Sequence, residues 1–310
     1  MTYKTLPADA RFVLRRQLNW LAVETVLLGI CFSRPLYELL RFSLHSDLFS
    51  YIPLIPAISA YLVWTEREKI TTEVRSCRIG AAIAFLIGTG IAAGWWQAAR
   101  AGWNPTHQDY LTLMTLSLVF FFWGACLGLL GWKVMRSAAF PAAFLIFAVP
   151  MPTAWVEHID AFFQITSAWT AQVFFNAVGT ATLRRGLELD LPGVPALLVG
   201  PECSGIHSTI VLFMTSFLAG YLFLRRTWTR TILVLAVVPL AILRNGFRIW
   251  VIGELCVHIS PTMIDSFIHR KGGPIFFALS LIPFFLLLVF LRRKDFNQSE
   301  APIKESTAQP

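Results

Sequence analysis

The sequence predicts an all-α protein, a polytopic membrane bundle of about eight transmembrane helices. First, 56% of its 310 residues are hydrophobic and only 14% are charged, whereas soluble domains carry roughly 25% charged residues. Second, apolar segments close to the roughly 20 residues that a membrane-spanning helix needs recur along the chain. Third, the five cysteines are scattered and form no CxxC pair, which excludes a disulfide scaffold and a cysteine-based zinc site. The composition also excludes an ordinary cytosolic enzyme and a disordered chain.

Eight segments are expected to span the membrane, although the second and fifth are short and the fifth contains three prolines. A basic N-terminus, residues 1–16, precedes them. No small-residue cleavage site follows it, so the first span is expected to be retained. A polar tail, residues 292–310, is expected to be cytoplasmic and disordered. The expected spans, which together form a membrane domain over residues 17–291, are 17–38, 49–64, 79–99, 111–132, 137–153, 203–224, 230–252 and 273–291.

The positive charges predict the orientation of the chain. If the N-terminus lies inside and the spans alternate, 17 lysines and arginines fall in inner segments and seven in outer segments. Cytoplasmic loops of membrane proteins carry an excess of these residues, so both termini are expected in the cytoplasm. The same rule explains the net charge of +8 without a nucleic-acid partner.

Two outer segments precede the sixth span. Residues 154–178 are apolar but contain four interrupting polar residues, a pattern typical of a short extracytoplasmic helix that lies at the interface or packs against the bundle. In residues 187–199, leucines alternate with acidic residues and a Pro-Gly pair supplies a turn. This alternation predicts a β-hairpin that leads directly into the sixth span.

Cys203 lies where outer backbone becomes the sixth span, in the segment GPECSGIHS over residues 200–208. The free N–H groups and positive dipole end of a helix N-terminus favour a thiolate, which is the reactive form of cysteine. The alternative is a small apolar residue packed in a span, and that interpretation suits Cys31 and Cys126.

Two more residue types that can take part in catalysis are expected at the same depth, near the outer ends of the spans. The seventh span contains Arg244 and Arg248, and an arginine within a membrane span indicates a functional site. Asn245 shares a helix face with Arg248, and His269 precedes the eighth span. A nucleophile, a cation and a base at one depth predict a site for acyl transfer. The alternative for Arg244 and for Arg248 is a buried ion pair that fixes the bundle. Possible partners in that ion pair are Glu202, Glu254 and Asp265. The alternative for the histidines is a solvated loop position, which is the interpretation for His258.

Three short motifs together resemble the exosortase/archaeosortase family over roughly residues 15–291. They are ECSGIHS, NGFRI about forty residues later, and H-x-x-x-G before the last span. The resemblance implies that Cys203, Arg248 and His269 are the catalytic residues, and it leaves His207 outside catalysis. Supporting or substrate-binding positions would be Glu202, Ser204, Gly205 and Asn245. It implies no metal and no cofactor.

The resemblance also implies a membrane cysteine transpeptidase or protease of the bacterial cytoplasmic (inner) membrane, with its site on the extracytoplasmic face. Its partners, besides membrane lipids, would be exported proteins with a three-part C-terminal sorting signal. That signal consists of a short Pro-Glu-Pro-type motif, a transmembrane helix and a basic tail, and cleavage would pass through a thioester on Cys203. The alternatives are a transporter or flippase that binds an anionic substrate through its intramembrane arginines, and a non-enzymatic scaffold. A structural disulfide between Cys203 and Cys256 also stays open.

Overall fold

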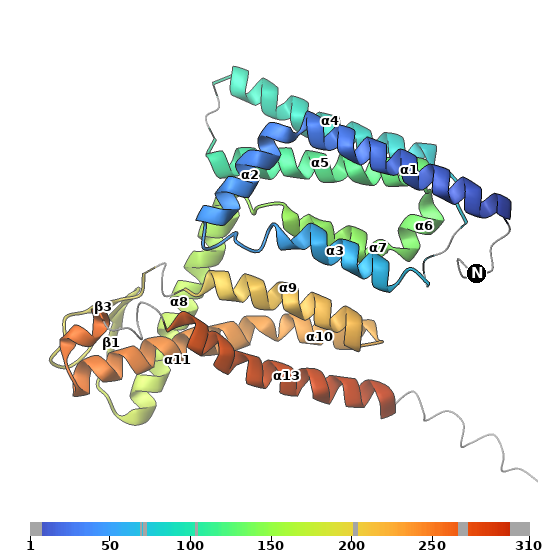
Figure 1. Cartoon of the computed structure of the whole chain (residues 1–310). Helices are drawn as coiled ribbons and strands as arrows, with labels where there is room; N and C mark the ends of the chain where they lie inside the picture. The colour runs from blue at the N-terminus through green and yellow to red at the C-terminus, as the bar shows by residue number, and fades with distance from the viewer. Residues whose placement is uncertain are drawn as a thin grey trace, which may run out of the picture. The chain divides into compact units, whose positions relative to one another are not determined.

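The computed structural model describes residues 8–68, 70, 73–102, 105–200, 204–265 and 272–297. The contacts between residues divide the chain into two compact units, Met1–Trp155 and Val156–Pro310. Helices dominate both units, as the sequence predicts, and the strands described here belong to the second unit (Figure 1).

The first unit is built on two long helices, α4 and α5, that pack side by side. They approach closely at two glycines: the Ser117 hydroxyl of α5 donates to the Gly88 carbonyl of α4 at 2.8 Å, and a Cβ at Gly124 would lie 3.1 Å from the Phe85 ring. Helix α1 packs along α5 (Figure 1). The helices of this unit are α1 (Ala8–Cys31), α2 (Ser33–His45), α3 (Leu54–Thr65), α4 (Arg78–Arg100), α5 (His107–Leu129), α6 (Trp132–Ser137), α7 (Ala139–Phe144) and the 3₁₀ helix η2 (Leu145–Ala148).

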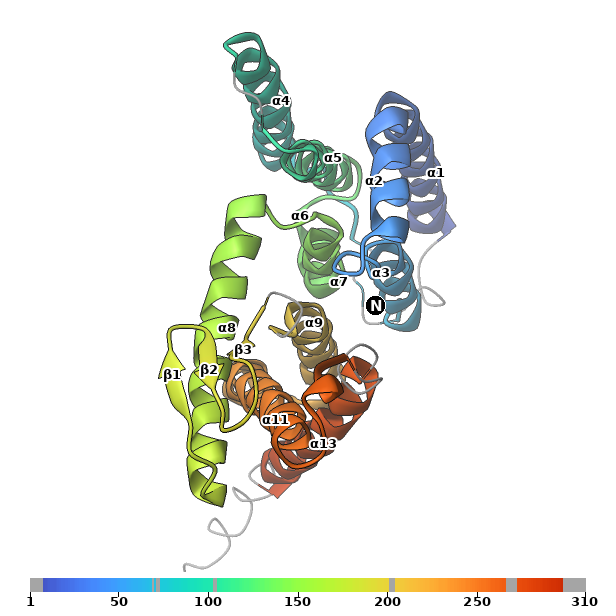
Figure 2. The ribbon, with the colours of Figure 1, turned by 90° about the vertical axis from the view of Figure 1, so that its left-hand side faces the viewer.

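In the second unit, α11 is the central helix, and it packs against α9, α10 and α13. Figure 2 shows α11 next to α8 and the strands. Helices α10 and α11 follow each other without a loop and form one apolar stretch, Thr227–His258. The elements are α8 (Thr153–Val178), β1 (Leu183–Arg185), β2 (Glu188–Asp190), β3 (Leu197–Leu198), α9 (Ile206–Phe223), α10 (Thr227–Leu235), α11 (Val237–His258), the 3₁₀ helix η4 (Pro261–Asp265) and α13 (Gly273–Asn297).

Five helical stretches in the described residues are long and apolar enough to cross a membrane: α4, α5, α9, α10 with α11, and α13. A sixth is reached if the stretches Ala139–Ala148 and Thr153–Val178 are taken as one broken span. The all-α membrane class is therefore confirmed. Three of the eight expected segments are helical but shorter or interrupted, namely 17–38, 49–64 and 137–153.

Prolines account for these interruptions. Segment 17–38 breaks between α1 and α2 at Phe32, because Pro35 has no N–H for the carbonyl of Cys31, four residues earlier, and its ring crowds that carbonyl. Segment 49–64 becomes helical only after Pro53, so α3 has 12 residues. In segment 137–153, Pro150 and Pro152 follow η2, and residues that precede proline are driven out of the helical region.

The polar tail was expected to be disordered from residue 292, and this expectation is wrong for its first residues because α13 continues to Asn297. The side chain of Asp295 is buried, at 3% exposure. Its Oδ2 accepts hydrogen bonds from the Arg225 N–H at 3.0 Å, the Arg226 N–H at 3.4 Å and the Thr229 hydroxyl at 3.0 Å. These donors lie at the start of α10, so Asp295 caps that helix from the end of α13. The rest of the expected tail, residues 298–310, lies outside the described residues.

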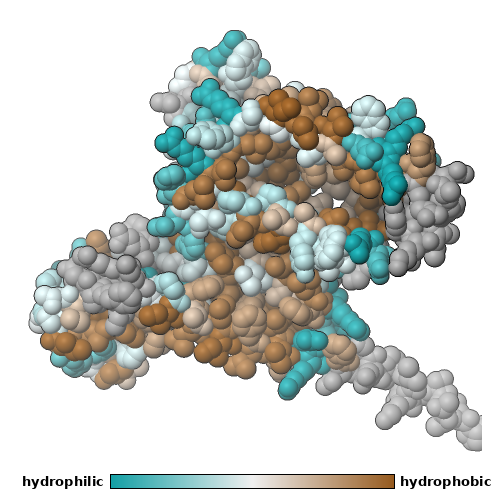
Figure 3. All heavy atoms as spheres, in the orientation of Figure 1, coloured by the Kyte–Doolittle hydropathy of each residue, from teal (hydrophilic) through white to brown (hydrophobic). Residues whose placement is uncertain are grey.

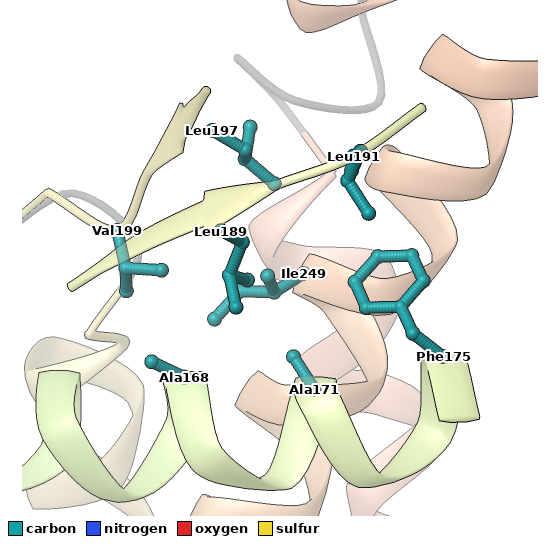
Figure 4. Close-up of a cluster of buried hydrophobic side chains, with 8 residues drawn as sticks. All are labelled: Ala168, Ala171, Phe175, Leu189, Leu191, Leu197, Val199 and Ile249. Atoms are coloured by element: carbon teal, nitrogen blue, oxygen red, sulfur yellow. The ribbon is translucent and has the colours of Figure 1, made fainter. Parts of the chain in front are cut away.

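The β-hairpin predicted over residues 187–199 is present, and it belongs to a three-stranded antiparallel sheet in the order β1-β2-β3. The additional hairpin joins β1 to β2 through Gly186, which has φ +66°. Apolar side chains of the sheet point toward α8 and α11 (Figure 4). The buried cluster consists of Ala168, Ala171, Phe175, Leu189, Leu191, Leu197, Val199 and Ile249.

Helix α8 packs against α11. The sequence left two placements open for residues 154–178, at the membrane interface or against the bundle, and the structure shows the second. At Gly246 of α11, a Cβ would lie 2.6 Å from the Thr170 side chain of α8, and at Gly253 it would overlap the Phe175 ring. Glycine at these two positions therefore permits the close approach of the helices. The sheet closes over this contact and leads the chain toward the start of α9.

Large apolar side chains cover much of the remaining helix surface. Figure 3 shows this surface over the helices of the second unit. On α13, for example, Ile275, Ile282 and Leu286 are each more than half exposed. A broad apolar surface of this kind is unfavourable in water but suits helices that face lipid.

Candidate active site

The predicted site residues fall into two groups. Ser204, Gly205, Asn245 and Arg248 lie within the described residues, where the start of α9 meets the middle of α11. The three others, Glu202, Cys203 and His269, lie outside the described residues. The described part of the site is therefore the backbone that directly follows Cys203 in sequence, together with the α11 side chains that hold it.

Gly205 caps the N-terminus of α9 in the left-handed region, with φ +63° and ψ +24°. Its carbonyl accepts hydrogen bonds from the Thr209 N–H and hydroxyl, at 3.0 and 2.9 Å, and from the Ser208 hydroxyl at 3.0 Å. A Cβ at this position would overlap the side-chain amide of Asn245 and lie 2.6 Å from Arg244 Nη2. Both the backbone conformation and the close approach of α11 therefore require glycine.

Asn245 and Arg244 hold two consecutive carbonyls at the start of α9. The Asn245 side chain, 2% exposed, donates its Nδ2 to the Ser204 carbonyl. Arg244, 8% exposed, donates its Nη2 to the Gly205 carbonyl at 3.1 Å and to the Thr209 hydroxyl at 3.2 Å. Arg244 also donates Nη2 and Nε to Asn245 Oδ1, at 2.9 and 3.1 Å. The two side chains therefore fix each other as well as the loop.

Ser204 is fully buried, and its hydroxyl accepts a hydrogen bond from the Ile206 N–H at 3.3 Å. This contact satisfies one of the donors that a helix N-terminus leaves open. Next to it, His207 is half-buried, and its Nδ1 is buried with no hydrogen-bond partner among the described residues.

The sequence reasoning left the role of Arg244 open and gave weight to Asn245 and Arg248, because those two share a helix face. Neighbouring residues such as Arg244 and Asn245 point about 100° apart around a helix. The arginine side chain is long enough to reach back to the face of Asn245, and the structure shows that it does. Arg248 lies one turn farther along α11 and is half-buried.

A polar cluster lies at the far end of α11, around Glu254. This carboxylate accepts hydrogen bonds from the Thr180 hydroxyl at 2.7 Å and from Trp250 Nε1 at 3.2 Å, and it contacts His258 Nε2 at 3.0 Å. The His258 side chain is 68% exposed. These contacts tie the segment between α8 and β1 to α11.

A cavity of about 1430 Å³ lies in the first unit. Its lining is mostly apolar and includes Leu21, Leu28, Leu39 and Phe122. None of the predicted site residues lines it, so its volume does not identify the site. Among the described residues, no group of three or more His, Cys, Asp or Glu side chains is arranged to hold a metal ion.

The sequence profile of the transmembrane exosortase family matches residues 43–286. This match covers most of the chain, including the start of α9 and all of α11. No curated protein matches the chain, and no solved structure does. The loop-anchoring residues described above lie within the matched range, and the chain belongs to the transmembrane exosortase family.

Proposed function

We propose that this exosortase is a cysteine-type transpeptidase or protease that cleaves the C-terminal sorting signal of exported proteins through a thioester on Cys203. Its substrates would carry the short motif, transmembrane helix and basic tail described above. The proposal rests on two side chains of α11 that hold consecutive backbone carbonyls at the start of α9. Asn245 and Arg244 hold the carbonyls of Ser204 and Gly205, and Cys203 is one peptide bond from Ser204.

This anchor matters for catalysis because a nucleophile must be held in a productive geometry. A well-oriented reacting group can gain about 7–11 kcal/mol over a freely diffusing one. The backbone next to Cys203 has buried hydrogen bonds on both carbonyls, and its N-cap glycine has no room for a side chain. A cysteine that only filled space between helices would not need its neighbouring backbone to be held by buried hydrogen bonds.

In the proposed reaction, the Cys203 thiolate attacks the scissile carbonyl and forms the new carbon–sulfur bond. The negative charge passes to the carbonyl oxygen, where Arg248 stabilises it. As the intermediate collapses, the carbon–nitrogen bond breaks and His269 gives a proton to the leaving amine. An acceptor amine or water then attacks the thioester, His269 takes its proton, and the Cys203 thiolate leaves.

The placement of the site is also part of the proposal. The bias of lysine and arginine toward one set of loops supports cytoplasmic termini and a site on the extracytoplasmic face of the inner membrane. Exported substrates would meet the enzyme on that face while their own transmembrane helices lie in the bilayer. The apolar helix surfaces of both units suit such a neighbour.

The test is co-expression with an exported reporter that carries a C-terminal sorting signal. Cys203→Ala, Arg248→Ala and His269→Ala should each abolish processing while the protein still inserts in the membrane. Arg248→Lys should also fail, because lysine lacks the planar two-pronged geometry of the guanidinium. Cys31→Ala is the matched control, since Cys31 is exposed on α1, and it should process normally. Normal processing by Cys203→Ala would overturn the proposal.

A further inference from the structure

We infer that the cavity of the first unit is a binding site for a phospholipid whose headgroup carries both a phosphate and a primary ammonium, as in phosphatidylethanolamine. The acyl chains would lie along α1, α3 and α5, and the headgroup would meet Arg67 and Glu68 at one end of the cavity. This inference goes beyond the proposed function and does not depend on the chemistry of Cys203.

The cavity lies between two groups of helices. Helix α3 packs on α7 and η2, whereas α1 and α2 pack on α5, and residues from all of these helices line the space between them (Figure 1). Along α5 the lining extends from Thr115 to Cys126, a rise of about 17 Å at 1.5 Å per residue. This length exceeds the depth of one leaflet, roughly half of a 30 Å hydrocarbon core. The space can therefore accommodate the length of an acyl chain.

The interior of the cavity offers few groups to a polar ligand. Four hydroxyl side chains contribute to its lining, and three of them donate to backbone carbonyls: Thr25 to Leu21 at 2.7 Å, Ser43 to Leu40 at 2.9 Å and Ser59 to Pro141 at 2.6 Å. An apolar cavity of this kind does not attract water. An apolar occupant would restore the dispersion contacts that the lining side chains lack. In a membrane, acyl chains are the apolar ligand at hand.

The walls of the cavity are open to the surroundings of the helices. Leu18 of α1 and Val63 of α3 both line it, and they are 46% and 41% exposed. Ala60, one turn before Val63 on α3, also lines it and is exposed. A chain can therefore enter from the adjoining bilayer without a rearrangement of the core.

The charges in the described part of the lining are confined to one end. They are those of Arg67 and Glu68, which follow the last turn of α3 on the expected cytoplasmic side. Neither side chain forms an ion pair with another described residue. The Arg67 guanidinium lies over the Trp64 ring instead, 5.1 Å from its centroid. One cation and one carboxylate thus lie where the headgroup of an inner-leaflet lipid would be.

This pair of charges selects among the possible occupants. A phosphate accepts hydrogen bonds from a guanidinium, and a primary ammonium donates them to a carboxylate. A lipid with both groups therefore complements Arg67 and Glu68 together. An anionic lipid would bring only negative charge to Glu68, and the basic tail of a sorting signal would bring only positive charge to Arg67. Like charges placed together in an interface are unfavourable.

The experiment measures the lipid that the full-length protein binds after delipidation. The purified protein is incubated with equal amounts of phosphatidylethanolamine and phosphatidylglycerol that have the same acyl chains, and bound lipid is counted by native mass spectrometry. The unaltered protein should retain phosphatidylethanolamine in preference. Ala60→Phe places a ring in the cavity and should reduce bound lipid at least about fivefold, which corresponds to about 1 kcal/mol. Ala57→Phe is the matched control, because Ala57 is exposed on the same helix but does not line the cavity.

Variants of the two charged residues test the headgroup. Arg67→Gln should reduce the binding of both lipids several-fold, since each has a phosphate. Glu68→Gln should remove the preference for phosphatidylethanolamine, because it removes both the partner of the ammonium and the repulsion of an anionic lipid. Both positions are exposed beyond the end of α3, so the substitutions do not disturb the core. Arg136→Gln, at an exposed position of α6 that does not line the cavity, should bind both lipids normally.

Three results would overturn the inference. Equal lipid retention by Ala60→Phe and Ala57→Phe would exclude the cavity as the site. Equal binding of the two lipids by the unaltered protein would exclude the headgroup assignment. Binding of a sorting-signal helix peptide that only Ala60→Phe abolishes, without retention of lipid, would make the cavity a groove for the substrate. Cys203→Ala should bind lipid normally, so a failure of the cysteine mechanism and a failure of the lipid site are separate results.

Discussion

Asn245 on α11 donates its side-chain amide to the backbone carbonyl of Ser204, 41 residues earlier in the chain. Both groups are buried, at 2% and 0% exposure. A buried carbonyl that loses its partner destabilises the fold by roughly 1–3 kcal/mol. The contact therefore couples the seventh expected span to the loop that leads into the sixth, one residue after the proposed nucleophile in the sequence.

Asn245→Ala should reduce processing at least about tenfold, an effect that corresponds to about 1.4 kcal/mol of lost transition-state stabilisation. The Ser204 carbonyl would lose its donor, and Arg244 would lose an acceptor for two of its hydrogen bonds. The measurement is the processed fraction of a sorting-signal reporter at equal membrane protein levels. Asn176→Ala is the control, because Asn176 is exposed near the end of α8. Equal processing by the two variants would contradict the importance of the anchor.

Gly205→Ala should abolish processing, whereas Gly186→Ala should retain it. Both glycines have positive φ, +63° and +66°, so each alanine carries a similar backbone penalty of roughly 1–2 kcal/mol. Only at Gly205 would the new Cβ overlap α11, since nothing lies within 4 Å of a Cβ at Gly186. The comparison isolates the close approach of α11 from the cost of the left-handed conformation. Comparable losses in both variants would show that the backbone conformation alone is responsible.

The sequence was sufficient for the fold class. Hydropathy over a 20-residue window reports directly on membrane helices, and the five stretches that pass the length and composition criteria lie on five of the expected spans. The alternating leucines likewise predicted a hairpin, and Leu189 and Leu191 are buried in the cluster of Figure 4. In both cases a local pattern determines a local structure.

The features that the sequence missed depend on contacts between distant residues. The end of α13 was expected to be disordered because its residues are polar, but Asp295 is held by the start of α10, about seventy residues away. For Arg244 the sequence favours a buried ion pair, whereas the structure shows its guanidinium on the Gly205 carbonyl and the Asn245 amide oxygen. Strand β1 was missed because its three residues carry no alternating pattern.

Gly246→Ala should destabilise the second unit by about 1–3 kcal/mol, the usual range for overpacking. A Cβ at this position would lie 2.6 Å from the Thr170 side chain and 3.2 Å from the Ala171 nitrogen, so the two helices must separate. Gly220→Ala is the control, because its Cβ would meet only ordinary contacts at 3.7 Å or more. The thermal midpoint in detergent should fall for Gly246→Ala and stay constant or rise for Gly220→Ala. A constant midpoint for both would exclude close packing at this contact.

Asp295→Ala should lower the thermal midpoint without abolishing processing at permissive temperature. The substitution removes the acceptor for the Arg225 and Arg226 N–H groups and the Thr229 hydroxyl. Loss of a helix cap typically destabilises by about 0.5–2 kcal/mol. Arg293→Ala, at an exposed position nearby, should have little effect. Complete loss of processing by a stably inserted Asp295→Ala protein would instead give the cap a role in the reaction.

The final prediction addresses the cysteine at the site and the face on which it lies. A membrane-impermeant thiol reagent added to intact cells should label Cys203 without prior reduction, because the extracytoplasmic face is expected to carry the reactive thiolate. Cys77, which precedes α4 on the expected inner side, should be labelled only after the membrane is opened. Cys256→Ser should retain processing, since Cys256 is buried at 2% exposure among α11 packing contacts.

Three labelling patterns separate the possible explanations. If Cys203 reacts only after reduction and Cys256→Ser is unstable, the two form a structural disulfide, which typically stabilises a protein by about 2–4 kcal/mol; a sulfur in that bond has no thiolate to attack a substrate. If Cys203 and Cys77 both react only after the membrane is opened, the site faces the cytoplasm and the charge-based orientation is wrong. If Cys203 alone reacts in intact cells without reduction, a free thiol on the outer face agrees with the proposed mechanism.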